Sequence, residues 1–371
     1  MTRAHAAVAA PAACALALLL ALAACRQQPD APATDAATTT TARTGTAPAA
    51  WAPELAQRIE AIDASTPGQL GVYVHDLHSG TEVEHAAARP WYLSSTVKVP
   101  VAIAVLQLAD EGALSLDEEL VLQESDFVDG AGDLLWQEPG VRYRLRTLLE
   151  KSLRNSDSTA TDMLIRRIGV DALNQRIQDW VGDGFGPLTT ILQVRYDAYG
   201  RLHPKVADLT NMDMVRLKNA AAGRERLQAL AVRVGVPASA FALDSIEAAF
   251  EEYYASGSNS ATLRAFGTLL QRLVEGELLS PEHTRLLLGH MREITTGDRR
   301  IRAGLPDAVE FAQKTGTQVE RACNVGVVHP RQPRHALVVA ACMEQFGELA
   351  NAEEAFRQLG EALAASGALQ P

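Results

Sequence analysis

The sequence predicts an α+β fold of two lobes, in which an antiparallel sheet with flanking helices carries an inserted all-helical lobe at about residues 94–304. Strand-like alternation occurs early, where "QLGVYVHD" (69–76) precedes the turn "HSG" and the segment "TEVEH". Strand-like sequence returns from about residue 305 and ends in a hairpin about "HPRQPRH". Because the strands come from both chain ends, the sheet must join distant segments, and the cleft between the lobes is the natural place for a small-molecule site.

Helical periodicity fills the middle of the chain and also closes it. The apolar segment 99–114 is interrupted by Gly112, which marks the end of a buried helix. Further helical patterns are predicted at 145–155, 158–168, 170–181, 239–254, 260–276 and 352–366.

Composition narrows the class of protein. The 371 residues carry a net charge of −11, and no basic stripe is present to neutralise phosphates, so nucleic-acid binding is not expected. Hydrophobic residues make up 47% of the chain, enough for a sizeable core, and we expect one monomeric domain at residues 51–371. There is no His-Glu-x-x-His motif, no paired-cysteine zinc pattern and no phosphate-binding glycine loop, so neither a metal nor a cofactor is expected.

The first 25 residues have the layout of an export signal, with a weakly positive start, an apolar run and small residues before Cys25. The ending "LAAC" resembles the lipobox of bacterial lipoproteins, whose cysteine is lipidated and becomes the mature N-terminus; cleavage without lipidation is the alternative. Residues 26–50 are rich in Thr, Ala and Pro and predict a flexible linker. We therefore expect an exported protein on the periplasmic face, lipid-anchored to a bacterial membrane.

Two cysteines remain in the body, Cys323 and Cys342, on the two arms of the predicted C-terminal hairpin. An antiparallel hairpin would bring them together, and export favours oxidation. Disulfide geometry is demanding, however, so two small buried residues without a bond are the favoured reading and a disulfide is the alternative.

The segment "YLSSTVKVP" carries the first chemical signal. Ser95 and Lys98 are separated by three residues and therefore project from one face of a helix. A serine hydroxyl is a poor nucleophile until a neighbouring base takes its proton, and a buried lysine can become that base whereas arginine cannot. Alone, the Ser-x-x-Lys pattern is weak, because chance alone produces it.

Two more stretches follow in order, Ser156-Asp157-Ser158 and Lys314-Thr315-Gly316. With Ser95 and Lys98 they resemble the signature of the class A β-lactamase and penicillin-binding protein superfamily of active-serine hydrolases. The flanking segments "NSDSTATDMLI" and "RAGLPDAVEFAQKTGT" also resemble this superfamily, and the resemblance covers about residues 55–368. It implies the two-lobed β-lactamase/DD-peptidase-like fold.

The resemblance also implies roles for individual residues. Ser95 resembles the nucleophile that the substrate carbonyl acylates, and Lys98 resembles the group that activates it. Ser156 resembles the hydroxyl that passes a proton to the leaving nitrogen, helped by Lys314. The backbone N–H groups of Ser95 and Thr317 match the oxyanion hole of the superfamily.

Substrate contacts are implied for the third motif. Lys314, Thr315 and Thr317 would bind the substrate carboxylate. Gly316 is expected because a Cβ there would obstruct substrate lying along the strand edge. Ser158 stands where the superfamily has Asn and offers one hydroxyl in place of an amide, which changes the contacts to substrate and to Lys98.

The deacylation base is the second departure. Class A enzymes carry a Glu on an Ω-loop, and here "VRYDAYG" offers Asp197 in its place, with Arg201 where the helping Asn belongs. Arg195 resembles the arginine of that loop and Asp208 its salt-bridge partner. Asp197 is therefore either the general base or a carboxylate that stabilises the loop. Residues 220–258, about forty in number, look like a helical insertion.

These features favour a serine β-lactamase that acylates at Ser95 and hydrolyses the β-lactam amide bond. A D-alanyl-D-alanine carboxypeptidase or other cell-wall peptidase shares the three motifs and lacks the Ω-loop Glu. A third possibility is a lipid-tethered penicillin-binding sensor or binding lipoprotein that deacylates poorly. The expected partners are accordingly a β-lactam or a cell-wall peptide, and a membrane through the lipid anchor.

Overall fold

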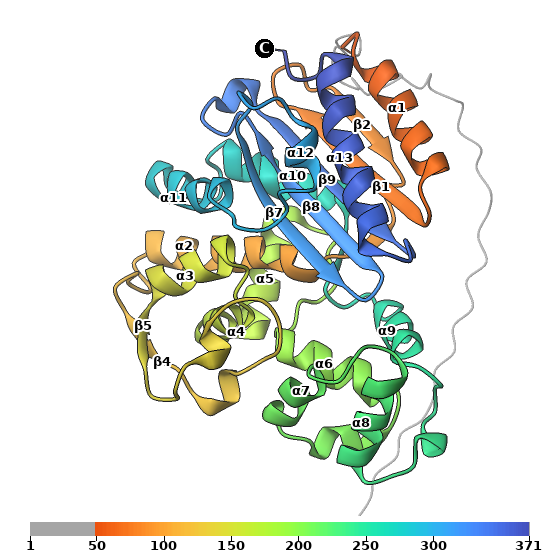
Figure 1. Ribbon diagram of the computed structural model, residues 1–371. Coiled ribbons are helices and arrows are strands. Elements are labelled where there is room, and N and C mark those ends of the chain that lie inside the picture. Colours follow the sequence, from red (N-terminus) through yellow and green to blue (C-terminus); the bar gives the residue numbers. More distant parts are fainter. Residues whose placement is uncertain (1–48, 371) are drawn as a thin grey trace, which may run out of the picture. The chain divides into compact units, whose positions relative to one another are not determined.

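The computed structural model describes residues 49–370, and Cys25 with the predicted signal and most of the linker lies outside them. A five-stranded antiparallel sheet forms the centre, in the order β2-β1-β9-β8-β7 (Figure 1). The first two strands come from the start of the body and the other three from its end, as the sequence predicts. The described strands are β1 Gln69–Asp76, β2 Glu82–His85, β3 Pro90–Tyr92, β4 Glu119–Val121, β5 Arg142–Arg144, β6 Ser260–Thr262, β7 Phe311–Gln318, β8 Arg321–Val328 and β9 Leu337–Glu344.

Helices make up most of the rest of the described chain. Each predicted helical pattern contains a helix, but α9 begins only at residue 246, and residues 260–262 of the predicted helix 260–276 form a strand. The structure also has four helices that the sequence analysis did not identify, namely α1, α6, α11 and α12. Their bounds are α1 Ala52–Ser65, α2 Lys98–Asp110, α3 Leu145–Arg154, α4 Ser158–Ile168, α5 Val170–Val181, α6 Ile191–Gly200, α7 Asn211–Leu217, α8 Arg224–Val234, α9 Ile246–Tyr254, α10 Leu263–Val274, α11 Pro281–Arg292, α12 Ile301–Gly304 and α13 Leu349–Ser366.

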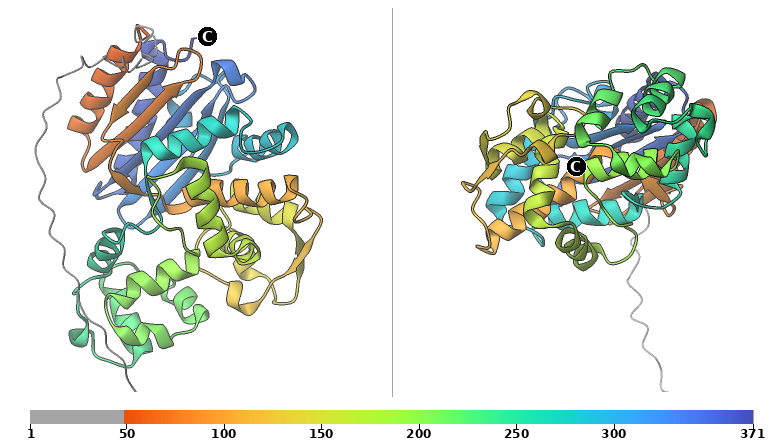
Figure 2. Two further views of the ribbon diagram at one scale, coloured as in Figure 1. Left: turned by 180° about the vertical axis from the view of Figure 1, so that it is seen from behind. Right: turned by 90° about the horizontal axis from the view of Figure 1, so that it is seen from below.

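Both faces of the sheet are covered. Helices α1 and α13 lie on one face, where β9 residues Val339 and Ala341 join their apolar side chains (Figure 1). Helices α10 and α11 lie on the other, where Val338 and Ala340 point, and the view from behind shows α10 across the strands (Figure 2). Successive side chains of a strand point to opposite faces of the sheet, so alternate residues of β9 pack into two different hydrophobic cores.

The C-terminal hairpin contains a disulfide. Cys323 and Cys342 are directly opposite each other in the β8–β9 register, with 4.0 Å between their Cα atoms, and their sulfur atoms are bonded. The favoured reading of two unbonded cysteines is therefore wrong, because the β8–β9 register places the two residues opposite each other and they form the disulfide.

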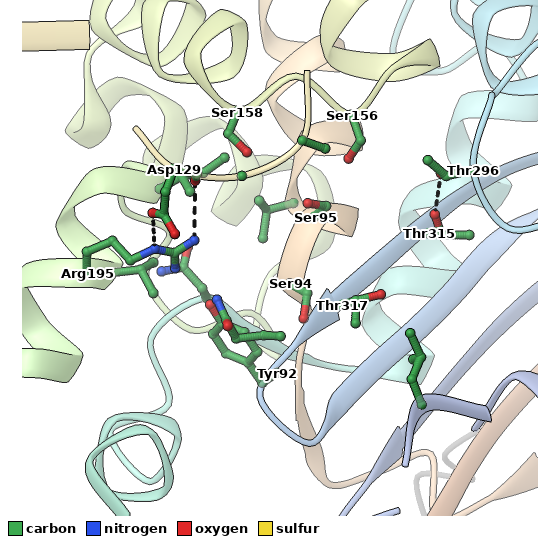
Figure 3. Close-up of a pocket in the computed structure, with 18 of the residues that line it drawn as sticks. Tyr92, Ser94, Ser95, Asp129, Ser156, Ser158, Arg195, Thr296, Thr315 and Thr317 are labelled. Atoms are coloured by element: carbon green, nitrogen blue, oxygen red, sulfur yellow. Dashed lines mark hydrogen bonds and ion pairs between the residues drawn. The ribbon is translucent and has the colours of Figure 1, made fainter. Parts of the chain in front are cut away.

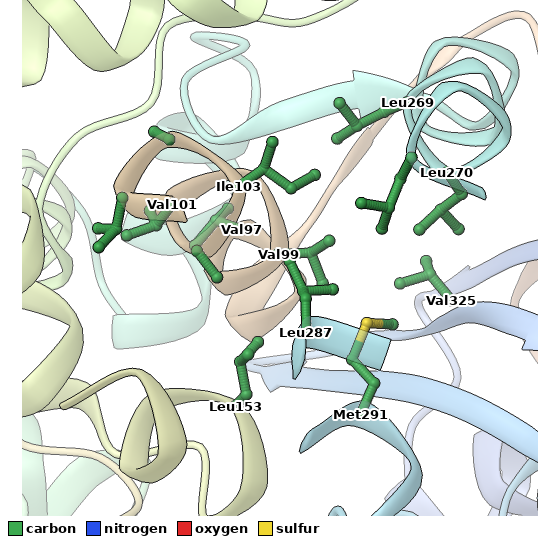
Figure 4. Close-up of a cluster of buried hydrophobic side chains, with 14 of the residues drawn as sticks. Val97, Val99, Val101, Ile103, Leu153, Leu269, Leu270, Leu287, Met291 and Val325 are labelled. Carbon is green, nitrogen blue, oxygen red and sulfur yellow. The ribbon is translucent and has the colours of Figure 1, made fainter. Parts of the chain in front are cut away.

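Helix α2 lies at the centre of the larger core. Every residue from Lys98 to Leu106 is buried, and a helix buried on all sides must be packed between other elements. Figure 4 shows Val99 near Leu287 and Met291 of α11, and Leu153 of α3 on another side. The start of α2, which carries the predicted lysine, is thereby held rigidly.

The inserted lobe is not purely helical. Two short antiparallel pairs, β3–β6 and β4–β5, lie within it. The predicted insertion, residues 220–258, contains α8 and α9 and shares a separate hydrophobic cluster with α6 and α7. Its acidic "FEEYY" end is partly internal, since Phe250 and Tyr253 are buried there. Within residues 49–370, no helix is long and apolar enough to cross a membrane.

Candidate active site

A cavity of about 520 Å³ lies between the edge strand β7 and the inserted lobe. Ser95, Ser156, Ser158, Thr315 and Thr317 all line it, so the three sequence motifs meet in one place (Figure 3). The two motif lysines lie directly behind this lining.

Ser95 and Lys98 belong to one turn of backbone. Ser95 lies in a 3₁₀ turn, Ser94–Val97, that runs into α2, and residues three apart are eclipsed in such a turn. Lys98 Nζ donates to Ser95 Oγ over 3.0 Å. Lys98 is 0% exposed, and this burial lowers its pKa from 10.5 to about 7, so a neutral amine is accessible near neutral pH.

Ser156 lies between the two lysines. Its Oγ accepts from Lys98 Nζ at 3.2 Å and from Lys314 Nζ at 3.0 Å, and its carbonyl accepts from Lys98 at 2.6 Å. Burial, with the charges of Lys98 and Arg300, lowers the pKa of Lys314 well below 10.5. Ser156 has a φ of 56°, and the hydrogen bond to its carbonyl holds this unusual backbone conformation. One hydroxyl is therefore connected to both amines.

Asp157 fixes the position of this turn. Its side chain caps α4 by accepting from Ala160 N at 2.8 Å, and it also accepts from the backbone N–H groups of Asp133 and Leu134. Ser158, the next residue, lies 3.5 Å from Lys98 Nζ through its Oγ. The short serine thus keeps a long contact to that lysine.

The β7 side of the cavity presents hydroxyl groups. Thr315 shares a 2.7 Å hydrogen bond with Thr296, and Thr317 accepts one of 2.5 Å from Arg300. Arg300 is 4% exposed and also donates to the carbonyls of Gly316 and Cys323. The sequence analysis missed Arg300, because "GDRRIRAG" offers three arginines at neighbouring positions and no motif that distinguishes one.

The reason expected for Gly316 is corrected. A Cβ on Gly316 would lie 2.6 Å from Leu93 O and 2.9 Å from Ser95 N. The glycine is thus required by the close approach of β7 to the backbone at the nucleophile, and the expected obstruction of substrate is not what the geometry shows.

Asp197 does not line the cavity. Its carboxylate accepts from Gln193 on the same helix at 2.8 Å, and it faces α9, where burial and then the charge of Asp197 raise the pKa of Tyr253. The structure therefore does not bring the predicted base to Ser95. The physical reason is that the segment forms helix α6, in which Gln193, one turn earlier on the same helix, holds the Asp197 carboxylate.

Arg195 has a different partner from the one expected. Its Nε lies 2.5 Å from Asp129 Oδ1, and the two side chains are only 10% and 13% exposed. The expected partner, Asp208, ends a separate 3₁₀ turn. The Arg195–Asp129 pair lies on the side of the cavity opposite Thr315 and Thr317 (Figure 3).

A buried carboxylate positions the start of α6. Asp162 accepts from the backbone N–H groups of Ile191 and Leu192 at 2.7 and 2.9 Å, while burial raises its pKa to about 7. Ile191 thereby lines the cavity. No motif indicates this role of Asp162, because its partner Ile191 is 29 residues away in the sequence. In the described part of the chain, no three His, Cys, Asp or Glu side chains are grouped closely enough to hold a metal.

The arrangement agrees with comparisons to known proteins. The sequence model of the Beta-lactamase enzyme family matches residues 54–366. A β-lactamase of Mycobacterium tuberculosis H37Rv is 26% identical over 276 residues, which cover 74% of this chain and 73% of that protein. A β-lactamase of Streptomyces albus G is 25% identical over 297 residues, which cover 78% of this chain and 77% of that protein.

Solved structures show the same fold. The β-lactamase of Sphaerobacter thermophilus superposes with a TM-score of 0.60 at 25% identity, over 86% of this chain and 99% of that one. A mutant of PBP-A, solved as an acyl-enzyme complex with penicillin G, superposes with a TM-score of 0.63 at 22% identity. The match covers 85% of this chain and 96% of the PBP-A chain. The predicted fold class and superfamily are confirmed: the chain belongs to the Beta-lactamase enzyme family and is a serine β-lactamase-like hydrolase.

Proposed function

We propose that Ser95 is acylated by the carbonyl carbon of a β-lactam ring. Ser95 Oγ attacks that carbon, Lys98 Nζ takes the hydroxyl proton, and the ring C–N bond breaks. The leaving nitrogen receives a proton from the Ser156 hydroxyl, which Lys98 then reprotonates. The observation that carries the proposal is the continuous chain Ser95–Lys98–Ser156–Lys314, with contacts of 3.0, 3.2 and 3.0 Å.

The hydroxyls of β7 support binding of a substrate carboxylate. Thr315 and Thr317 face the cavity, and Arg300 holds the Thr317 hydroxyl from behind. Lys314 adds a donor at the same wall, and an incoming carboxylate would favour its charged form. The oxyanion hole is assigned to the backbone N–H groups of Ser95 and Thr317, consistent with β7 being an edge strand with unpaired backbone groups.

A second candidate function rests on what the cavity offers for hydrolysis of the acyl-enzyme. Two carboxylates line the cavity, Asp129 and Glu353, and Asp129 is bound to Arg195. Asp197 lies outside, and the start of α6 presents the aliphatic Ile191. A carboxylate free to activate water is the usual means of deacylation. This favours a peptidase acting on cell-wall peptides, or a penicillin-binding sensor, in which a penicilloyl group is retained.

A time course with a chromogenic cephalosporin and the purified protein separates the two. Sustained turnover that Ser95→Ala abolishes supports a β-lactamase. A burst equal to one product per protein, with a mass increase located at Ser95, supports the peptidase or sensor. Ile191→Glu supplies a carboxylate in the cavity and should shorten the lifetime of the acyl-enzyme in the second case. No burst and no labelling would refute acylation altogether.

We also propose that the chain is exported and lipid-anchored through Cys25, on the basis of its signal-like start and lipobox-like ending. Metabolic labelling with a radioactive fatty acid should mark the full-length protein and not the Cys25→Ser variant. Absence of label from the wild type would leave export without an anchor.

A further inference from the structure

A second cavity, of about 880 Å³, lies on the side of α11 away from Ser95. It shares no lining residue with the active-site cavity, and its volume is that of a typical small-molecule pocket. Its walls come from the α10–α11 connection, α11 and the β8–β9 loop.

Helix α11 divides its residues between the core and this cavity. Leu287 and Met291 point into the core beneath α2 (Figure 4). Residues 285, 288, 289 and 292 recur at the spacing of one helix face and line the cavity, and Leu288 among them also belongs to the core cluster. The exposed face of α11 is therefore both apolar and basic.

Positive charge is concentrated around the cavity in a chain whose net charge is −11. Four arginines line it, and Glu310 is shared between Arg292 and Arg331 at 3.2 and 2.9 Å. Residues 49–370 place no carboxylate within 4.0 Å of the guanidinium of Arg285 or Arg334. Glu275 is the one acidic residue in the lining, and it accepts from Gln271 at 3.1 Å.

The interior of the cavity is apolar. Leu77, Val274 and Leu288 contribute aliphatic surface, and three prolines edge it. The Thr284 hydroxyl, which also lines the cavity, is buried without a hydrogen-bond partner among the described residues. An apolar interior with two guanidinium groups at the rim that lack a carboxylate partner differs from the surface of an ordinary charged helix, where apolar and basic groups are not enclosed together.

We propose that this cavity binds one amphiphile with an anionic head group, a phosphate or a carboxylate, on an apolar body. Guanidinium groups bind both anions through paired N–H donors. Arg285 donates its Nε–H to Pro281 O at 2.9 Å, which leaves its terminal NH2 groups for an anion, and Arg334 has no carboxylate partner among the described residues. The aliphatic interior takes the apolar body, so inorganic phosphate alone would leave most of the volume unfilled. The site is separate from acylation at Ser95 and does not depend on it.

The test is calorimetric titration of the full-length protein with monododecyl phosphate and with laurate, each below its critical micelle concentration. Saturable one-to-one binding of either is expected, and the preferred one distinguishes a phosphate source from a fatty-acid source. Dodecyltrimethylammonium and inorganic phosphate serve as controls and should bind at least tenfold more weakly. Equal binding of the cationic amphiphile, equal binding of inorganic phosphate, or no binding of either anionic amphiphile would overturn the proposal.

Three variants locate the site. Arg285→Glu with Arg334→Glu should weaken binding at least tenfold, while Arg58→Glu with Arg299→Glu, an equal change of charge on exposed arginines elsewhere, should not. Gly289→Leu should also weaken binding, because a Cβ at Gly289 meets no atom within 4 Å and the new side chain can occupy the cavity without moving the backbone. Binding unaffected by both changes would place the amphiphile elsewhere and refute the site.

Discussion

The titration of Lys98 gives the sharpest test of the acylation chemistry. Burial lowers its pKa from 10.5 to about 7, which is a difference of about 5 kcal/mol between its charged and neutral forms. At pH 7 about half of the molecules then carry a neutral amine, about a thousandfold more than for an ordinary lysine. Because only the neutral amine accepts the Ser95 proton, the acylation rate should rise tenfold per pH unit below about 7 and level off above it.

The measurement is single-turnover labelling of the protein by a fluorescent penicillin between pH 5 and 9. Lys98→Arg should abolish labelling, because arginine keeps its proton, whereas Lys205→Arg, on an exposed turn, should not change it. Asp162→Asn should move the midpoint to lower pH, since the ionised fraction of Asp162, whose own pKa is about 7, raises the pKa of Lys98. A rate that is flat across this range, or one that continues to rise tenfold per unit beyond pH 8.5, would refute the reasoning.

Three further predictions concern the surroundings of the site. Gly316→Ala should slow acylation roughly a hundredfold by displacing the nucleophile's backbone, with Gly289→Ala as a control of equal size change; unchanged labelling would show that β7 yields freely. Asp129→Asn should cost about 3 kcal/mol in urea denaturation by leaving Arg195 unpaired, and a cost below 1 kcal/mol would mean that water replaces the carboxylate. Reducing the β8–β9 disulfide, which closes a loop of 19 residues, should lower stability by about 3 kcal/mol, and an unchanged melting temperature would contradict this.

The fold was predictable because strand alternation and helix periodicity are local properties. That one sheet joins both chain ends needed only one further step, since strands at the two ends have to meet, whereas the order of the strands was not predicted. The meeting of Ser95, Ser156 and Lys314 was implied by the resemblance of three short motifs to the superfamily signature. In each of these cases, the information lies in residues close together in sequence.

The missed features depend on contacts between distant segments. Arg195 was expected to pair with Asp208. Its partner in the structure, Asp129, lies 66 residues away in the sequence, in a loop without a motif. Asp197 is close to Arg195 in sequence, yet the helix directs it elsewhere, and assigning it to the site required a loop that does not form. The role of Asp162 is likewise visible only once α6 is seen to begin against it.

The two halves of the reaction are supported to different extents by this structure. The side chains proposed for acylation are held in place by several hydrogen bonds. Ser156 accepts one from each of the two lysines, and Asp157 fixes the turn that carries it. Deacylation needs a water molecule and a base, and the part of the wall where α6 enters carries Ile191, fixed by two backbone hydrogen bonds to a buried carboxylate. Because the backbone at the start of α6 is fixed, a substitution of Ile191 changes the side chain that the cavity wall presents and leaves the position of the wall unchanged. The lifetime of the acyl-enzyme is thus decided separately from its formation.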